Sequence, residues 1–351
     1  MVLGAGFAGL TIASELDSLA ATGKADVTLV DRKIHFSVGF SMQWVLVGRR
    51  KPEDGQRPYT SLQARHVKFI HDEIVAIDTA EQAVHTRSKH LNYDYLVIAL
   101  GAELAPELVP GLPRGGYDLH DMDSVIQLKT ALEGIDSGTV AIVVTSVPFK
   151  CPPAPYEYAM LIDDMLRNRG VRENVRVVVS TPEPQPMPLA GKVVGDAIKS
   201  LLADRGIEYL PQHKSTSVDN IGHKIIYENG WELSYDVLGA VPPHRAPGVV
   251  RDAGLTNESG FVPVDLWSFE TSVPNVYAVG DVASLRLPDG RPHPKAGAFA
   301  EAQASTLARN IVAQLAGGET ARYSGIGVCF VDAGGDMAAA AEANLLADGG
   351  P

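Results

Sequence analysis

The chain has 351 residues, of which 45% are hydrophobic and 21% charged, and its formal net charge is −12. A chain this acidic lacks the basic face that binds a nucleic-acid backbone, so we expect no nucleic-acid partner. Its mean hydropathy of +0.02 excludes general disorder. Its two cysteines, Cys151 and Cys329, are too few for a disulfide-rich scaffold, a four-thiolate zinc site or an iron–sulfur cluster, and no other metal site can be read.

The chain opens on a glycine-rich turn between an apolar strand and a helix-compatible segment, residues 10–19. The turn carries Gly-x-Gly-x-x-Gly, in which Gly4 permits the tight turn, Gly6 lets a pyrophosphate approach the backbone and Gly9 lets helix and strand pack closely. A second apolar strand ends at Asp31, 22 residues after the last glycine, which suits an acid that binds a ribose hydroxyl. The pattern predicts a dinucleotide site rather than a glycine-rich turn alone.

Two later segments complete the expected flavin site. Residues 93–102 read as a buried strand that reaches Gly101, and residues 275–281 read as a strand that ends in Gly280-Asp281. Both are similar to motifs of flavoproteins with two dinucleotide domains, in which the aspartate contacts the ribityl–phosphate chain of FAD. A helix N-cap is the compatible alternative for Asp281. We therefore predict FAD binding by a domain that an insertion interrupts.

The expected fold class is α/β, with two Rossmann-like dinucleotide-binding domains, the second inserted in the first, and a short C-terminal segment. A second series of strands and helices supports the insertion, with apolar strands at 139–144 and 175–179 around a helical stretch at 156–169. The predicted division is FAD-binding domain 1–110 and 253–318, second domain 111–252, and C-terminal segment 319–351.

The second domain lacks the feature that would bind a nicotinamide cofactor. In NAD(P)H-dependent relatives, a second glycine loop follows the first strand of this domain. Here the loop, residues 145–157, contains no glycine and four prolines. Proline lacks the N–H that would hold a phosphate, so we expect an electron donor other than a nicotinamide.

A cysteine occupies this loop instead. Cys151 lies just before a helix that begins near Pro155, whose N-terminus would favour a thiolate. The alternative is a buried, inert cysteine that acts as a small hydrophobe. Cys329 is preceded by two glycines and follows a predicted helix at 298–315. Sequence spacing leaves open whether both thiols reach the flavin ring.

The segment Cys-Pro-Pro-Ala-Pro-Tyr-Glu at 151–157 resembles the motif of the flavoprotein subunit of flavocytochrome c sulfide dehydrogenase and of its sulfide:quinone oxidoreductase relatives. Further similar segments are 241–247, 295–301 and the Gly-x-Cys-Phe sequence that ends at Phe330, so the likeness covers nearly the whole chain. The resemblance implies that Cys151 and Cys329 form a redox-active pair beside the flavin.

The resemblance also implies a reaction and its site residues. Sulfide would open a disulfide by exchange, so that one cysteine becomes a persulfide and the other, as a thiolate, passes electrons to the flavin. Lys295 would lie near the pyrimidine end of the flavin and stabilise negative charge on the reduced ring. Glu157 is a candidate proton relay; the preferred alternative is a first-turn acid that the helix dipole favours.

The resemblance assigns a wider set of residues to the FAD site: Gly4, Gly6, Phe7, Ala8, Gly9, Asp31, Arg32, Val75, Gly101, Gly280, Asp281 and Lys295. Residues 35–41 lack the third cysteine that tethers the flavin in some relatives, so the expected FAD is non-covalent. Phe330 is a candidate for a quinone pocket, with core burial preferred. His244 and Arg245 suit a loop contact and a solvated surface equally well.

The expected partners are sulfide and either quinone or a separate cytochrome, since no haem-attachment Cys-x-x-Cys-His is present. We expect a location in the cytoplasm or peripheral to the membrane. Membrane-binding relatives continue with amphipathic helices beyond the equivalent of Asp348, so contact with a membrane stays an open question. Whether the chain forms a homo-oligomer is also open. Two other functions compete: a type-two NADH:quinone reductase, and a non-enzymatic flavoprotein with inert cysteines.

Overall fold

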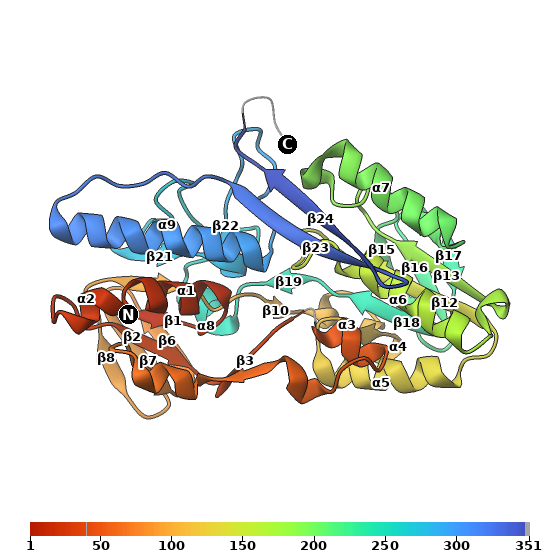
Figure 1. Ribbon diagram of the computed structural model, residues 1–351, viewed down its shortest axis with the longest axis horizontal. Coiled ribbons are helices and arrows are strands. Elements are labelled where there is room, and N and C mark those ends of the chain that lie inside the picture. Colours follow the sequence, from red (N-terminus) through yellow and green to blue (C-terminus); the bar gives the residue numbers. More distant parts are fainter. Residues whose placement is uncertain (40, 348–351) are drawn as a thin grey trace.

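A computed structural model describes residues 1–39 and 41–347 of the chain; Phe40 and residues 348–351 lie outside the described part. Two five-stranded parallel sheets lie next to each other along the long axis of the molecule, and helices cover them (Figure 1). This arrangement confirms the predicted α/β class with two dinucleotide-binding units.

The first sheet contains the glycine-rich turn and is built from two separate parts of the chain. Its strand order is β21 (Val276–Ala278), β9 (Leu96–Ile98), β1 (Val2–Leu3), β2 (Thr28–Asp31) and β5 (Lys68–His71). Two helices, α1 (Phe7–Glu15) and α9 (Gly297–Ala316), pack against each other over this sheet. The part of the molecule around this sheet is called the first, or flavin-binding, half, and the part around the second sheet is called the second half. Because β21 pairs with β9, residues after the insertion complete the sheet that the N-terminus begins.

The second sheet lies wholly within the inserted segment. Its strand order is β11 (Tyr117–Asp118), β18 (Val237–Val241), β12 (Gly138–Val144), β13 (Val175–Ser180) and β14 (Glu208–Leu210). Its helices are α5 (Met122–Gly134), α6 (Ala154–Asn168) and α7 (Gly191–Asp204). The central strands are valine-rich and buried, as expected for a parallel sheet covered on both faces.

Short elements fill in the rest of each half. β6 (Ile74–Asp78), β7 (Ala83–Thr86) and β8 (His90–Asn92) form a small antiparallel sheet. Further small sheets are β15 (Ser215–Asp219), β16 (Lys224–Tyr227) and β17 (Glu232–Ser234); β3 (His35–Ser37) and β4 (Gln56–Pro58); and β20 (Val262–Pro263) and β22 (Ala283–Ser284). The short helices are α2 (Asp17–Ala21), α3 (Ser41–Leu46), α4 (Leu112–Gly115) and α8 (Gly248–Asp252).

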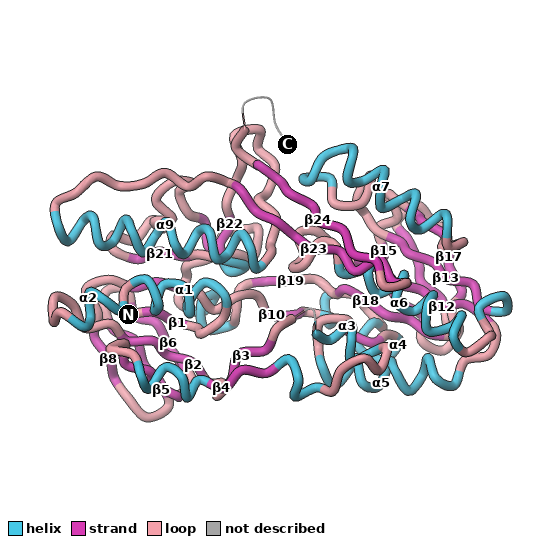
Figure 2. Tube along the Cα trace, in the orientation of Figure 1, coloured by secondary structure: helices cyan, strands magenta, loops and turns pink. Residues whose placement is uncertain are grey.

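Two features join the halves. β10 (Glu103–Leu104) and β19 (His244–Arg245) pair antiparallel where the chain passes between the sheets. A long hairpin, β23 (Ile326–Gly334) and β24 (Met337–Asn344), crosses from the region of α9 to α6 (Figure 2). Among the described residues, no helix is both long enough and apolar enough to span a membrane.

A buried carboxylate anchors this hairpin to α6. Asp163 is fully buried and accepts hydrogen bonds from Arg167 at 2.8 Å, from Arg205 at 3.3 Å and from Arg172. Arg205 also donates to the Ala333 carbonyl of β23 at 2.5 Å. Asp163 therefore neutralises cations that hold helix and hairpin together.

We predict that Asp163→Asn lowers the free energy of unfolding by about 3–5 kcal/mol, because it removes the charge partner of the Arg172 guanidinium, whose side chain is only 12% exposed. The matched control is Asp136→Asn, which removes a carboxylate with 81% side-chain exposure from its ion pair with Arg169. Its expected loss is below about 1 kcal/mol. Urea denaturation measures both, and equal losses would contradict the assignment.

Candidate active site

The glycine-rich turn has the shape that a pyrophosphate requires. A Cβ atom at Gly4, whose φ is +96°, would lie 2.5 Å from the Ala99 carbonyl oxygen, and one at Gly9 would lie 1.7 Å from the Gly4 carbonyl oxygen. At Gly6, by contrast, the Cβ position has no described heavy atom within 4 Å outside its own chain neighbours. Gly4 and Gly9 thus serve backbone packing, and Gly6 faces open space at the start of α1. This cradle fits the phosphates of a dinucleotide.

Asp31, at the end of β2, binds the backbone of the same turn. Its carboxylate accepts hydrogen bonds from the Ala5 amide at 2.6 Å and from the Lys33 amide at 2.7 Å. A carboxylate has about four acceptor positions, so capacity remains for a ribose hydroxyl. Tyr59 adds a support that the sequence analysis missed, since its hydroxyl donates to the Ala5 carbonyl at 2.5 Å.

The outer residues predicted for the FAD site come from α1, from the end of β2 and from β6. Phe7 packs edge-on against Phe36 with ring centroids 5.0 Å apart, and Ala8 is buried beneath it. Arg32 is exposed and pairs with Glu73 at 3.6 Å. Val75, on β6, is half exposed. These placements are compatible with a cofactor that runs along the edge of the sheet, and they remain predictions.

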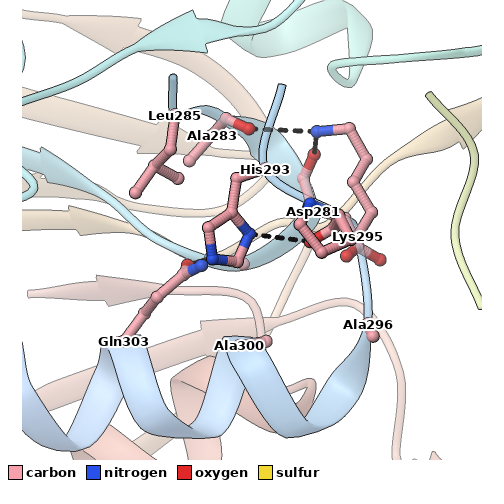
Figure 3. Close-up of a pocket in the computed structure, with 10 residues that line it drawn as sticks. Asp281, Ala283, Leu285, His293, Lys295, Ala296, Ala300 and Gln303 are labelled. Atoms are coloured by element: carbon pink, nitrogen blue, oxygen red, sulfur yellow. Dashed lines mark hydrogen bonds between the residues drawn. The ribbon is translucent and has the colours of Figure 1, made fainter. Parts of the chain in front are cut away.

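The residues of the Gly-Asp motif line a small pocket together with Lys295 and the start of α9 (Figure 3). The ammonium of Lys295 donates to the carbonyl oxygens of Asp281 at 2.7 Å and Ala283 at 3.0 Å, and it lies 3.6 Å from the ring centroid of Phe261. Burial lowers the pKa of Lys295 to about 8. Gly280 and Gly101 both have positive φ, +77° and +67°. The backbone therefore turns sharply at the end of β21 and just after β9.

Asp281 is not the N-cap of the following helix. It lies within a short 3-10 turn, Gly280–Val282, and α9 begins only at Gly297. Burial raises the pKa of its carboxyl, while Lys295 and Lys150 lower it. The helix-cap alternative is therefore wrong, and a polar role in the cleft remains for this carboxyl.

Cys151 connects the two halves through its backbone. It adopts a left-handed conformation with φ +57°, and its amide donates to the Lys295 carbonyl at 2.9 Å. Helix α6 begins three residues later, at Ala154. Burial nevertheless raises the pKa of the Cys151 thiol, and Glu157 raises it further. Desolvation thus outweighs the effect of the helix N-terminus that was expected to favour a thiolate at Cys151.

Glu157 joins the segments that carry the cysteines. It is 3% exposed in the first turn of α6, where its carboxylate accepts from the Gln43 side chain and from the Asp332 amide of β23, both at 2.8 Å. Burial raises its pKa to about 7. The location in the first turn was anticipated, but the side chain is buried and bound on two sides. Gln43 escaped the sequence analysis because it lies 114 residues away.

Cys329 lies on β23, the hairpin strand that packs on α6. Both cysteines are free, partly buried thiols that pack against the core of the second half, and Cys329 raises the pKa of Cys151 electrostatically. Burial, and secondarily Glu157, raises the pKa of Cys329 too. No bond joins the two thiols, and the proximity predicted for the pair stays a prediction.

An apolar cavity of about 250 Å³ opens beside Cys329. Its walls come from the loops after β12 and β13, from the segment before α9, and from the hairpin. Prolines dominate the lining, including Pro148, Pro152 and Pro184. The cavity lies at the carboxyl ends of parallel strands, where α/β proteins generally bind ligands.

The structure also decides the positions of three further residues from the sequence analysis. Phe330 is 73% exposed on the outer face of the hairpin, so its expected core burial is wrong, because alternate residues of β23 point away from α6. His244 is buried, which rules out a solvated surface for this residue. Arg245 contacts Glu103 at 2.6 Å and Glu107 at 2.7 Å beside the connection between the halves.

Comparisons with known proteins place this geometry in a family. Residues 1–305 match the family described as pyridine nucleotide-disulphide oxidoreductase, and the chain belongs to it. It is an FAD-dependent oxidoreductase, and it binds FAD without a covalent bond. The predicted resemblance, enzyme class and cofactor are confirmed.

The relatives include enzymes of two kinds. The mitochondrial sulfide:quinone oxidoreductase of Mus musculus is 26% identical over 333 residues, which cover 89% of this chain and 70% of that protein. A type II NADH:quinone oxidoreductase of Staphylococcus haemolyticus is also 26% identical, over 89% of this chain and 81% of its own length. The solved sulfide:quinone oxidoreductase of Aquifex aeolicus has the same fold, with a TM-score of 0.83 at 22% identity, over 98% of this chain and 86% of that one.

We predict that Glu157→Gln makes both thiols more reactive, because the Glu157 carboxylate raises both thiol pKa values. Well below the pKa, a thiol pKa lower by one gives about tenfold more thiolate. Iodoacetamide rates measured against pH should therefore shift to lower pH. Glu133→Gln, a half-exposed carboxylate on α5, is the control and should leave the profile unchanged. An unshifted profile in Glu157→Gln would refute the electrostatic link.

Proposed function

We propose that the chain oxidises sulfide through Cys151 and Cys329 and passes the electrons through FAD to a quinone. The observation that carries this proposal is the contact at Glu157: this residue lies in the first turn of the helix that follows Cys151, and its carboxylate accepts a hydrogen bond at 2.8 Å from the Asp332 amide of the strand that carries Cys329. Cys151 is also bonded through its backbone to Lys295, in the wall that presents the Gly-Asp motif. We therefore expect the flavin ring beside this backbone contact.

The residues suit exchange chemistry between sulfur atoms. Hydrosulfide attacks one sulfur of a Cys151–Cys329 disulfide; the S–S bond breaks, one cysteine becomes a persulfide and the other leaves as a thiolate. The persulfide and thiolate then combine into a trisulfide, which releases two electrons and the persulfide proton. When bound, FAD supplies the acceptor for that electron pair. Glu157, with a pKa of about 7, can take up and return a proton near neutral pH.

The cavity beside Cys329 supports a sulfur substrate rather than a nicotinamide. A pyrophosphate needs several backbone amides directed at it, and proline at 152 and 153 removes two of them at this loop. The apolar lining suits neutral sulfur chains, which carry no hydrogen-bonding groups. This observation favours sulfide over NADH as the donor, although relatives of both kinds exist.

The outer face of the hairpin supports the quinone part of the proposal. Ile326, Val328 and Phe330 are 43%, 38% and 73% exposed on the strand that carries Cys329. Exposed apolar patches of this kind mark sites for apolar partners. A quinone that reaches this face brings the enzyme to a membrane surface. If the sulfide-reduced enzyme reduces a cytochrome but not a quinone analogue, the electron acceptor is a cytochrome and not a quinone.

The experiment that tests the donor is anaerobic titration of the FAD-loaded enzyme. Sulfide should bleach the flavin absorbance, and NADH should leave it yellow. Bleaching by NADH alone would identify a type-two NADH:quinone reductase. A third outcome is that neither donor reduces the flavin and that the number of titratable thiols is the same with and without reductant. This result would indicate a non-enzymatic flavoprotein.

We predict that Cys151→Ser and Cys329→Ser each abolish rapid flavin reduction by sulfide, because a single thiol cannot form the bridge that sulfide opens. FAD should stay bound, since the glycine turn and the Gly-Asp motif are untouched. Stopped-flow absorbance measures the rate, and reduction by dithionite is the control. A Cys151→Ser variant that reduces its flavin with sulfide at the wild-type rate would refute the mechanism.

A further inference from the structure

One cation at the interface has no role in the chemistry so far. Lys150 precedes Cys151, and its backbone forms a parallel bridge with Lys295. Its side chain is partly buried, and among residues 1–39 and 41–347 its ammonium has no hydrogen-bond or ion-pair partner. A desolvated ammonium without an acceptor is unfavourable, so this position points to a group that another molecule supplies.

The groups around Lys150 come from both halves. Asp281 and Lys33 belong to the flavin-binding half, and Asp118, Cys151 and two histidines belong to the second half. Asp281 is the strongest of its charged neighbours, and Asp118 is the next. Together with its backbone bridge to Lys295, these neighbours place Lys150 where the two halves meet.

The histidines near Lys150 do not take the place of the missing acceptor. His120 and His244 have ring centroids 5.5 Å apart, and the Nε2 atoms of both are buried without a partner. Lys150 lowers the pKa of both rings, as their burial does, so both are neutral. Nδ1 of His244 lies 2.8 Å from the Pro242 carbonyl oxygen. Lys150 is therefore a cation next to two uncharged histidine rings, and neither ring supplies a negative charge to pair with it.

We propose that Lys150 is a second cation of the flavin site, which donates to the isoalloxazine and stabilises the negative charge of its reduced form. This inference rests on the proposed function for the position of the ring, because it takes Cys151 and Lys295 to lie beside it. It does not rest on sulfide as the donor.

The ring is favoured over the pyrophosphate as the partner of Lys150. The phosphates have their own site at the turn of Gly4, Gly6 and Gly9 and the start of α1. Lys150 instead shares a turn with Cys151 and a backbone bridge with Lys295, which places it at the reactive end of the cofactor. A fixed cation in a water-poor site stabilises developing negative charge strongly.

The test is the midpoint potential of the bound flavin. An auxiliary reducing enzyme slowly reduces the flavin and a reference dye together, without sulfide, and the dye reports the potential of the solution. The variants are Lys150→Met and Lys150→Gln, which remove the charge, and Lys150→Arg, which keeps it. At fixed dye potential, both neutral variants should lower the ratio of reduced to oxidised flavin at least tenfold, which is 29.6 mV for a two-electron couple. Lys150→Arg should restore most of this ratio.

The control is Lys33→Met, which removes an exposed cation from the same electrostatic environment and should leave the ratio unchanged. FAD affinity is measured in parallel by fluorescence. Weaker FAD binding with an unchanged ratio would identify a phosphate contact and overturn the proposal, as would an unchanged ratio in either neutral variant. Because no sulfide is used, a failure here differs from a failure of sulfide to bleach the wild-type flavin.

Discussion

The carboxylate of Glu157 connects three segments that lie far apart in the sequence. It belongs to the first turn of α6, it accepts from Gln43 on α3, and it accepts from the Asp332 amide on β23. The cysteine loop leads directly into α6, and Cys329 lies on β23, so Glu157 ties together the two segments that carry the thiols. The Asp163 network ties helix and hairpin together a second time, further along α6. The site is therefore assembled by buried polar contacts between elements and not by one continuous loop.

Burial gives these contacts their chemical character. It raises the pKa values of both thiols and of Glu157 and lowers that of Lys295, so each group is moved toward its neutral form. For Glu157 the effect on stability has a definite sign. A carboxyl whose pKa is raised to about 7 stabilises the fold fully below its ordinary value near 4.5, and this contribution is lost as the pH rises through 7. Ionisation of this carboxyl at neutral pH thus lowers the stability of the fold, a cost that is common at functional sites.

The connection between the halves explains why one chain can bring a flavin and two thiols together. The Cys151 amide binds the Lys295 carbonyl, and Lys150 pairs with Lys295 along the backbone, so the second half meets the wall of the first directly. The loop that holds a nicotinamide in relatives is replaced by a proline-rich turn that positions a thiol. In the proposed function, this loop and not the sheets behind it sets the electron donor.

Much of this protein could be inferred from its sequence because the relevant signals are local. A glycine turn between strand and helix, an acid at the end of the next strand, and a loop with prolines in place of glycines each depend on a few neighbouring residues, as does the α/β pattern itself. The protonation of the thiols, the support of the turn by Tyr59, the contact of Gln43 with Glu157, the exposure of Phe330 and the position of Lys150 were decided only by the tertiary structure. The physical reason is that desolvation and pairing depend on which distant segments pack together, and no short stretch of sequence encodes its distant neighbours.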